Sequence, residues 1–272
     1  MKMKFHYMLA PMEKLVDASF RTICHKYGAD LTFTELVRFE GLAKGNNSAV
    51  KRIRLCDDTP TYIQFMGKIE DKLEKFLNKF EPSNGFLGFN FNLGCPSQNY
   101  TNQGVGCAMV KRPTKTARLV DIVKDYGYAV NVKMRLGMTK IEKEDKLFIK
   151  LIEKVNADFF VVHARYRSES YRKEPDWNAL EECVNTGKSI IANGNIETID
   201  HVTFMKEMGC EGVMIGRPAL INPLIFAELR GISTPLLDEV WKEYLELVNS
   251  REMNYSKRLL SIEKNDLKNL KG

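Results

Sequence analysis

The sequence lacks the features of membrane-embedded and exported proteins. No uninterrupted apolar run approaches the roughly 20 residues that a membrane-spanning helix requires. The N-terminal stretch MKMKFHYMLAP has no long apolar centre and no small-residue cleavage site, and Glu13 follows closely. We therefore expect a cytoplasmic protein with no membrane partner, whose N-terminal stretch forms a first strand.

Paired cysteines of the C-x-x-C type are also missing. The six cysteines stand singly, at positions 24, 56, 95, 107, 183 and 210. A structural zinc site usually draws its ligands from closely spaced pairs, so we expect no bound metal. Scattered cysteines in a chain of this size are typical of a reducing compartment and free thiols. An isolated cysteine is most often an inert core residue, so any chemical role for Cys95 needs a separate argument.

Repeats, low-complexity segments and a dinucleotide-binding fingerprint are absent as well. Gly104-Val105-Gly106 is too short for that fingerprint and does not follow the first strand. The 41 Lys and Arg against 35 Asp and Glu give a net charge of +6. This balance permits a polyanionic partner such as RNA without requiring one. Charge is densest after Arg251, where it marks either a solvated helix face or a surface that contacts phosphate.

What the sequence does contain is a regular alternation of eight short, apolar, β-rich segments with longer helix-like segments. Such alternation predicts parallel strands joined by crossover helices. Eight units within about 230 residues favour a closed (β/α)8 barrel, the TIM-barrel class, over a doubly wound open sheet. The predicted strands are 5–10, 29–35, 61–66, 86–92, 128–134, 158–164, 188–194 and 211–216. The predicted helices are 17–27, 70–79, 114–125, 142–155, 177–185 and 198–208.

The alternation stops after Pro223. Two later segments, 236–248 and 253–270, have the apolar spacing of helices and no strand between them. We therefore expect a barrel domain over residues 1–231, followed by a short helical appendage over residues 232–272.

Polar and glycine-rich clusters end seven of the eight predicted strands. In a (β/α)8 barrel these ends converge on one face, where active sites are built. Near the ends of the last two strands, Gly194 and Gly216 let the backbone approach a phosphate, and Arg217 can neutralise its charge. The alternative is that these glycines only make turns. The clusters are Pro11-Met12-Glu13, Gln64, Asn92 to Pro96, Lys133 to Arg135, His163 to Arg165, Asn193 to Asn195, and Gly216-Arg217.

Six of these regions together resemble the tRNA-dihydrouridine synthases in order and in spacing. The resemblance covers about residues 5–226. It is carried by LAPMEKLVDASFR (9–21), NLGCP with GVGCAMV (92–96 and 104–110), VKMRLG (132–137), VHARYR (162–167), ANGNI (192–196) and VMIGRPALINP (213–223).

The resemblance implies an FMN-containing barrel in which NADPH, or NADH, supplies electrons to reduce uridine in tRNA to 5,6-dihydrouridine. Hydride would pass from N5 of the flavin to C6 of the uracil ring. Cys95 matches the family's proton donor and would protonate C5. This role suits a thiol, which at an ordinary pKa of about 8.5 is mostly protonated at neutral pH. We expect tRNA as the macromolecular partner and a monomeric protein.

The other site residues implied by the resemblance fall into two groups. One group would bind the cofactor: Pro11, Met12, Glu13, Gln64, Lys133, His163, Asn193, Gly194, Asn195, Gly216 and Arg217. The second group would bind the substrate: Asn92, Arg135, Arg165 and Arg167.

The chain departs from the family pattern at several positions. Asn90 and Asn195 stand where aspartate is usual, and Cys107 replaces a small residue. The C-terminal helical region that binds tRNA is also shorter here, and we expect residues 232–272 to bind RNA. Two other functions compete with RNA reduction: a flavin barrel acting on a free pyrimidine or a dihydroorotate-like metabolite, and a flavin-poor RNA-binding scaffold.

Overall fold

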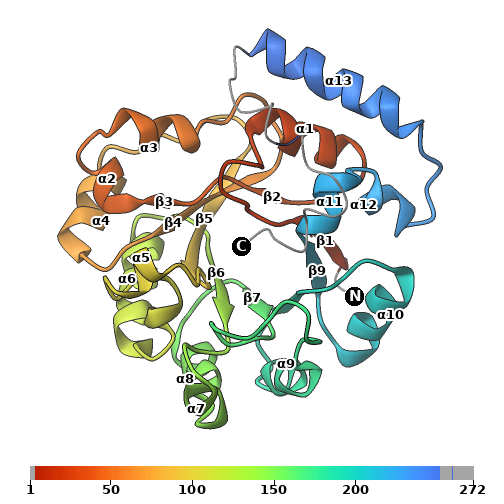
Figure 1. Cartoon of the computed structure of the whole chain (residues 1–272). Helices are drawn as coiled ribbons and strands as arrows, with labels where there is room; N and C mark the ends of the chain where they lie inside the picture. The colour runs from red at the N-terminus through yellow and green to blue at the C-terminus, as the bar shows by residue number, and fades with distance from the viewer. Residues whose placement is uncertain (1–3, 252–258, 260–272) are drawn as a thin grey trace.

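The computed structural model describes residues 4–251 and residue 259, which form a ring of parallel strands surrounded by helices (Figure 1). The strand order is β1-β9-β8-β7-β6-β5-β4-β2, with β3 also beside β4. A parallel bridge between Met8 and Leu31 joins the two ends of this order. The predicted (β/α)8 barrel is confirmed. The strands are β1 (His6–Leu9), β2 (Thr32–Phe33), β3 (Val37–Arg38), β4 (Thr61–Met66), β5 (Phe86–Leu93), β6 (Val130–Arg135), β7 (Phe160–His163), β8 (Ile190–Asn193) and β9 (Gly212–Ile215).

The second barrel position differs from the prediction, because the expected strand 29–35 is replaced by two short strands. Both β2 and β3 pair with β4, at Thr32–Thr61 and Val37–Phe65. Between them, the Thr34 hydroxyl accepts the backbone N–H of Gln64 at 2.9 Å. The Thr34 side chain thus takes the place of a backbone carbonyl as the acceptor for Gln64. This interrupts the backbone hydrogen bonding to β4 and divides the strand into β2 and β3.

Most predicted helices are present, and the differences have local causes. The expected helix 142–155 is divided in two because Lys146 has a left-handed backbone, with φ of 52°. The short helices after β3 were not predicted, since they span too few turns for a clear apolar period. The helices are α1 (Ala18–Lys26), α2 (Phe39–Leu42), α3 (Asn47–Arg52), α4 (Glu70–Leu77), α5 (Gln98–Thr101), the 3₁₀ helix η1 (Gly106–Met109), α6 (Pro113–Asp125), α7 (Lys140–Glu144), α8 (Leu147–Lys154), α9 (Trp177–Val184), α10 (Ile199–Met208), α11 (Arg217–Ile221), α12 (Ile225–Glu228) and α13 (Leu237–Ser250).

The barrel interior is apolar at one end and polar at the other. An apolar cluster inside the ring includes Met8, Phe33, Val161 and Met214, all buried. On β6, alternate residues Val130, Val132 and Met134 instead join the larger core beneath the helices, as a period of two requires. The intervening β6 residues are Asn131, Lys133 and Arg135, of which Lys133 and Arg135 bring charged groups to the carboxyl end of the ring.

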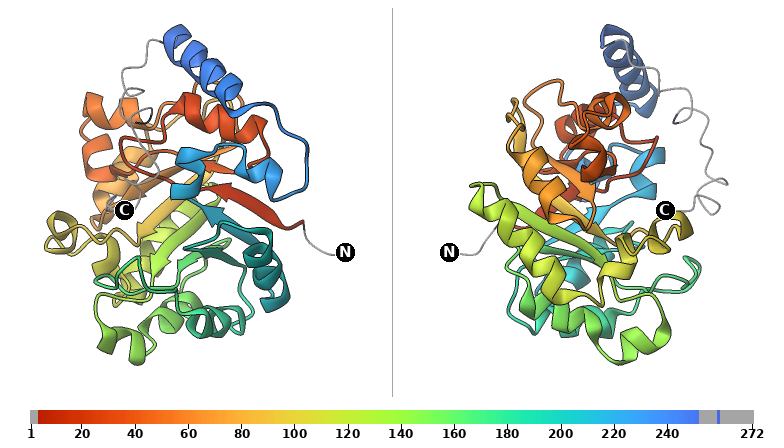
Figure 2. Two further views of the ribbon diagram at one scale, coloured as in Figure 1. Left: turned by 45° about the vertical axis from the view of Figure 1, so that its right-hand side comes forward. Right: turned by 90° about the vertical axis from the view of Figure 1, so that its left-hand side faces the viewer.

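Helix α13 lies outside α1, on the flank of the barrel (Figures 1 and 2). Trp241 stacks on Phe20 with ring centroids 6.2 Å apart, and the buried Tyr244 hydroxyl donates to Asp17 at 2.8 Å. The predicted helix 236–248 is thus confirmed and packs directly on the barrel. The predicted helix 253–270 lies outside the described residues, apart from Leu259, and the domain boundary at residue 231 remains a prediction. No helix within the described part of the chain is both long and apolar enough to cross a membrane.

Candidate active site at the carboxyl ends of the strands

Strand register places the predicted site residues side by side at the carboxyl ends of the strands, a face that we call the barrel mouth. Arg135 on β6 pairs with His163 on β7, which pairs with Asn193 on β8. On the other side of β6, Lys133 pairs with Asn92 on β5. Residues from four consecutive strands therefore form one continuous polar surface.

The backbone around Cys95 is held from two sides. The side-chain oxygen of Asn92 accepts the N–H groups of Gly94 at 3.0 Å and Cys95 at 2.8 Å, which closes a tight turn after β5. From η1, the N–H of Cys107 donates to the carbonyl of Cys95 at 3.1 Å. Gly106 permits this approach, because a Cβ atom there would lie 2.9 Å from the same carbonyl, and its φ is +62°.

The Cys95 thiol is partly buried, and this burial raises its pKa. A backbone hydrogen bond from Ser97 and the nearby charges of Arg135 and Lys133 act in the opposite direction, but the raised pKa persists. Cys95 is therefore a protonated thiol at neutral pH, able to donate a proton and poorly suited to act as a thiolate nucleophile.

Four cations gather at the ends of β6, β7 and β9, and their hydrogen-bond partners are neutral. The Lys133 ammonium donates to Asn193 at 2.9 Å, and Arg217 approaches Asn195 at 3.5 Å. Arg135 donates to the carbonyl of Tyr166, and Arg165 donates to the carbonyl of Lys173. Over residues 4–251, no carboxylate lies within ion-pairing distance of any of these four groups. The site therefore carries positive charge that the protein itself does not neutralise.

This excess charge changes the protonation of the neighbouring groups. Burial, together with the charge of Arg135, lowers the pKa of Lys133 to about 7. Burial and the four surrounding cations hold the pKa of His163 well below its ordinary value. His163 is accordingly neutral, and its Nε2 accepts a hydrogen bond from Arg165 at 2.9 Å. A neutral histidine and a lysine of weakened basicity are what a dense, buried cluster of cations produces.

Tyr171, which the sequence patterns did not single out, lies among these cations. It belongs to the loop between β7 and α9, and its hydroxyl accepts a hydrogen bond from Arg135 at 2.6 Å. The guanidinium carbons of Arg217, Arg135 and Arg165 lie 4.6, 5.2 and 5.6 Å from the centre of its ring. The family-like segment VHARYR ends at Arg167, four residues before Tyr171. The sequence therefore contained no sign that the loop would fold back and bring this ring into the site. Arg165 is fully buried beneath this loop, so it cannot face solvent as a surface contact would.

The remaining predicted substrate-binding arginine, Arg167, contacts the cysteine turn. Its Nε donates to the carbonyl of Pro96 at 2.8 Å, while its own N–H donates to the carbonyl of Gly137. Arg167 thus connects the β7 loop to the segment that follows Cys95.

The loop after β1 forms the opposite wall of the mouth. A Cβ atom built on Gly216 would lie 3.6 Å from the sulfur of Met12, so the ends of β1 and β9 are close. Glu13 points to a different partner and pairs with Arg52 at 2.9 Å. Glu35, at the end of β2, accepts the N–H of Lys14 and so anchors this loop. Glu35 is the last residue of the predicted strand 29–35, and that strand is the one whose end was not counted among the polar clusters.

Gly194 is required where the β8 end passes His163. Its φ is +115°, and a Cβ atom there would lie 2.9 Å from His163 Cδ2 and 3.3 Å from Arg165 Nη1. Asn195 follows in a left-handed conformation with φ of 48°. This backbone therefore lies directly against the cationic cluster at the barrel mouth.

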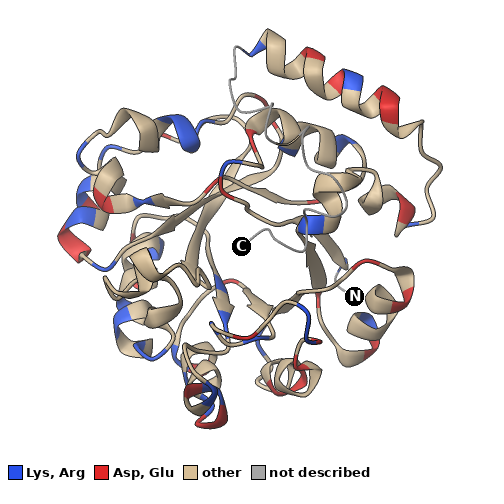
Figure 3. Ribbon diagram, viewed as in Figure 1, with Lys and Arg blue, Asp and Glu red and all other residues tan. Residues whose placement is uncertain are grey.

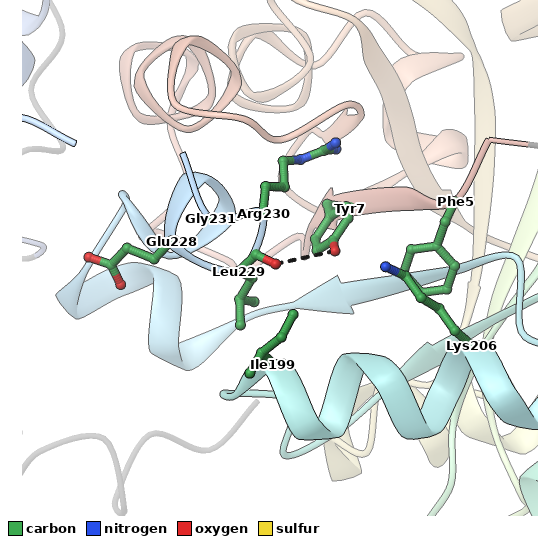
Figure 4. Close-up of a pocket in the computed structure, with 8 residues that line it drawn as sticks. All are labelled: Phe5, Tyr7, Ile199, Lys206, Glu228, Leu229, Arg230 and Gly231. Atoms are coloured by element: carbon green, nitrogen blue, oxygen red, sulfur yellow. Dashed lines mark hydrogen bonds between the residues drawn. The ribbon is translucent and has the colours of Figure 1, made fainter. Parts of the chain in front are cut away.

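One open hollow of about 700 Å³ lies on the outer wall of the barrel, away from these residues (Figure 4). It lies between α10 and the segment that follows α12, and Tyr7, Lys206 and Arg230 line it. None of the predicted site residues contributes to it. Within the residues that the structure describes, no group of three or more His, Cys, Asp and Glu side chains is arranged to hold a metal ion.

The chain is similar in sequence to the members of one protein family. Residues 8–266 match the model of the family described as dihydrouridine synthase (Dus). The chain is 29% identical over 251 residues to a probable tRNA-dihydrouridine synthase of Helicobacter pylori, covering 89% of this chain and 75% of that protein. It is 30% identical over 235 residues to probable tRNA-dihydrouridine synthase 2 of Bacillus subtilis, covering 81% of this chain and 70% of that protein.

The chain belongs to the dihydrouridine synthase family. Its similarity to tRNA-dihydrouridine synthase B of Pseudomonas putida, 27% over 252 residues, covers 88% of this chain. The family match extends from β1 to beyond α13, and membership makes the protein an oxidoreductase. The family resemblance expected from six sequence segments is thus confirmed.

Proposed function

We propose that this protein is a flavin-dependent tRNA-dihydrouridine synthase, which reduces the C5=C6 bond of specific uridines with Cys95 as the acid. The observation that carries this proposal is the juxtaposition at the barrel mouth of a protonated thiol with four cations that the protein does not neutralise. A dihydrouridine synthase needs a proton donor beside an anionic cofactor. This face of the barrel has both the thiol and the charge for such a cofactor.

The residues fit FMN as the cofactor. Its phosphate would be held by Arg217, the backbone at Gly194 and Gly216, and the neutral His163. The buried Nε of Arg165 has no hydrogen-bond partner within the described structure, and such an orphan is costly unless a ligand satisfies it. When bound, the flavin supplies the hydride that reduces the uracil ring. Gln64 on β4 and Lys133 on β6 lie on either side of β5, where they would contact the ring, with Pro11, Met12 and Glu13 along its edge.

The chain's own groups account for the proton and for the position of the base. Protonation of C5 needs a group that stays protonated at neutral pH, and the raised pKa of Cys95 meets this need. Asn92 lies three residues before Cys95 in the same turn, and the charge of Arg135 acts on the thiol; the NH₂ group of Asn92 and the guanidinium of Arg135 are the donors that we assign to the carbonyl groups of uracil. Arg167 steadies the turn through Pro96. A uridine within folded tRNA would have to leave its stack to reach this depth.

The proposal extends to NADPH or NADH as reductant, to tRNA as partner and to action as a cytoplasmic monomer. The names of the curated relatives support the RNA substrate. The basic balance of the chain supports a polyanionic partner.

The test is Cys95→Ala in the purified, flavin-loaded protein, with RNA from cells that lack the protein as substrate. NADPH oxidation and flavin absorbance should be unchanged, whereas dihydrouridine formation should fall at least about 100-fold, the scale of losing a general acid. Mapping of dihydrouridine in the RNA measures the product. Cys56→Ala is the matched control and should leave product formation intact. Full product formation by Cys95→Ala would refute the role of Cys95, and activity on free uracil alone would refute the RNA substrate.

A further inference from the structure

A chain of four side-chain amides connects the neighbouring strands β4, β5 and β6 and begins at the turn of Cys95, and we call it the amide chain. Asn92 donates to Gln64 at 3.0 Å, and Gln64 donates to Asn90 at 2.6 Å. Asn90 donates in turn to Asn131, whose amide nitrogen reaches the carbonyl of Phe89 at 3.4 Å. Every amide gives its NH₂ group to the next oxygen, so the chain has a single direction.

The inner part of the amide chain is closed to water. Gln64 is 1% exposed, and Asn90 and Asn131 are fully buried. A buried amide that loses its partner keeps the full cost of desolvation, about 1–3 kcal/mol. Reversal of any one amide would place two oxygens or two NH₂ groups face to face. The buried members therefore hold one another in a single orientation.

The mouth end of the chain determines how Asn92 meets the cysteine turn. Because Asn92 gives its NH₂ group to Gln64, its oxygen must face the opposite way, where it accepts the N–H groups of Gly94 and Cys95. If Asn92 were reversed, its NH₂ group would face those two N–H donors and the turn would lose both bonds. The orientation set by the buried amides is thus transmitted to the backbone of Cys95.

We propose that Asn131 and Asn90 are positioning residues for Cys95, acting through the amide chain although neither lies in the mouth. This inference rests on the proposed function only for its effect on turnover, because the geometry concerns the thiol itself. The two asparagines depend on each other. Asn90 must donate to Asn131, and a side chain without a hydrogen-bond donor at position 90 would break this bond.

The experiment compares Asn131→Ala with Asn131→Asp in the full-length protein. The alanine removes the acceptor for Asn90, whereas the aspartate retains it. The first measurement is the rate at which iodoacetamide alkylates Cys95 across a pH series, resolved by peptide mass spectrometry. Cys56 on the same molecule serves as the internal reference thiol. Thr61→Val is the matched control. Like Asn131, Thr61 is a buried strand residue with a hydrogen-bonded side chain, here to Thr32, but it lies outside the amide chain.

In Asn131→Ala, we expect the turn to loosen and the alkylation profile of Cys95 to move to lower pH, with a rate relative to Cys56 at least about threefold higher near neutrality. Asn131→Asp and Thr61→Val should retain the wild-type ratio. The second measurement is turnover. In Asn131→Ala, kcat for dihydrouridine formation should fall by roughly ten- to a hundredfold, the scale of a misplaced catalytic group, with KM for RNA unchanged.

An unchanged alkylation ratio in Asn131→Ala would overturn the positioning role, whatever the turnover. An equal change in Thr61→Val would also overturn it, since general loosening of the barrel would then be the cause. If Asn131→Ala does not fold, Asn90→Leu roughly preserves the volume and removes the donor of the same hydrogen bond, and it should raise the alkylation ratio in its place. Alkylation needs no substrate. If the wild-type protein forms no dihydrouridine and Asn131→Ala still shifts the Cys95 profile, the proposed function is refuted and the positioning role stands.

Discussion

At the scale of single residues, the site combines groups that are costly in the folded protein. Lys133 and Arg165 are taken from water among other cations, and the pKa values of both are lowered by burial and by Arg135. Such groups lower stability until a ligand of opposite charge arrives. Their presence at the mouth is therefore better explained by binding than by folding.

Lys133→Met should stabilise the cofactor-free protein. The pKa of Lys133 falls from 10.5 to about 7 on folding, so its charge opposes folding fully below pH 7, and the penalty disappears as the pH approaches 10.5. Lys133 is partly exposed, so solvent screens part of this penalty. We expect the free energy of unfolding to rise by about 1–2 kcal/mol in Lys133→Met, or the midpoint of thermal unfolding to rise by roughly 2–6 °C at pH 7.

Thermal melts of the two proteins from pH 6 to pH 10 measure this effect, and their midpoints should converge at the alkaline end. Lys188→Met, at an exposed position, is the control and should show no such convergence. A Lys133→Met protein less stable than wild type at pH 7 would contradict the assignment, and flavin affinity should fall in that variant alone.

Gly194→Ala should impair cofactor binding much more than folding. The new methyl group would lie 2.9 Å from His163 Cδ2 at a φ of +115°, so the backbone or the imidazole must move. We expect at least a tenfold weaker Kd for FMN, measured by fluorescence quenching. Gly187→Ala is matched, because that glycine also has a positive φ but open space around it. If the two variants bind FMN equally well, the close approach at Gly194 has no role in binding.

At the scale of elements, the joint between α13 and α1 is the contact that most directly connects the C-terminal helix to the barrel. Asp17 caps α1 by accepting the N–H of Phe20 at 2.8 Å, and its other oxygen accepts the Tyr244 hydroxyl. Burial and the nearby Asp17 raise the pKa of Tyr244 far above its ordinary value. The phenol therefore remains protonated and donating at every accessible pH.

Tyr244→Phe should lower stability by about 1–3 kcal/mol, because it leaves a buried carboxylate oxygen without its partner. Chemical denaturation followed by circular dichroism measures the change. Tyr27→Phe is the control, since it removes another hydrogen bond between the end of α1 and α13, from Tyr27 to Glu243, at a partly exposed site. Tyr27→Phe should lower the free energy of unfolding by about 0.5 kcal/mol or less. Equal losses in the two variants would show that burial at Asp17 contributes nothing.

The elements themselves were largely predictable from sequence, and the failures are local. Seven strands lie within two residues of their predicted bounds. The strand at 29–35 was misjudged because the Thr34 hydroxyl replaces a backbone bond, an event with no signal in apolar periodicity. The helix at 142–155 was misjudged because a single left-handed residue, Lys146, can interrupt a sequence that is helical on both sides.

At the scale of the whole molecule, the helix that begins the expected RNA-binding region carries more negative than positive charge. Both signs are spread over the outer helices (Figure 3). Helix α13 carries four carboxylates, at 238, 239, 243 and 246, against Lys242. This helix is poorly suited to contact phosphate. If residues 232–272 bind RNA as proposed, the contacts must come from the basic residues that follow α13 in the sequence.

Replacing Lys264, Lys268 and Lys271 with glutamine should therefore weaken RNA binding without changing NADPH oxidation. Each lost phosphate contact should reduce the slope of log affinity against log salt by about 0.7–0.9. Titrations of labelled tRNA at several salt concentrations measure this slope. Lys242→Gln on α13 is the control and should leave it unchanged. A triple variant with the wild-type slope would remove these lysines from the RNA interface.

The sequence by itself determined the barrel and the family, and it predicted Cys95 as the thiol that we propose as the acid. Period-two and helical apolar patterns are local properties, and parallel strands must bring their carboxyl ends to one face. Only the tertiary structure decided which partners those residues have. Burial of Arg165, the place of Tyr171 among three arginines and the direction of the amide chain all depend on side chains from different strands. Their energies arise from desolvation and mutual orientation, which exist only once the ring has closed.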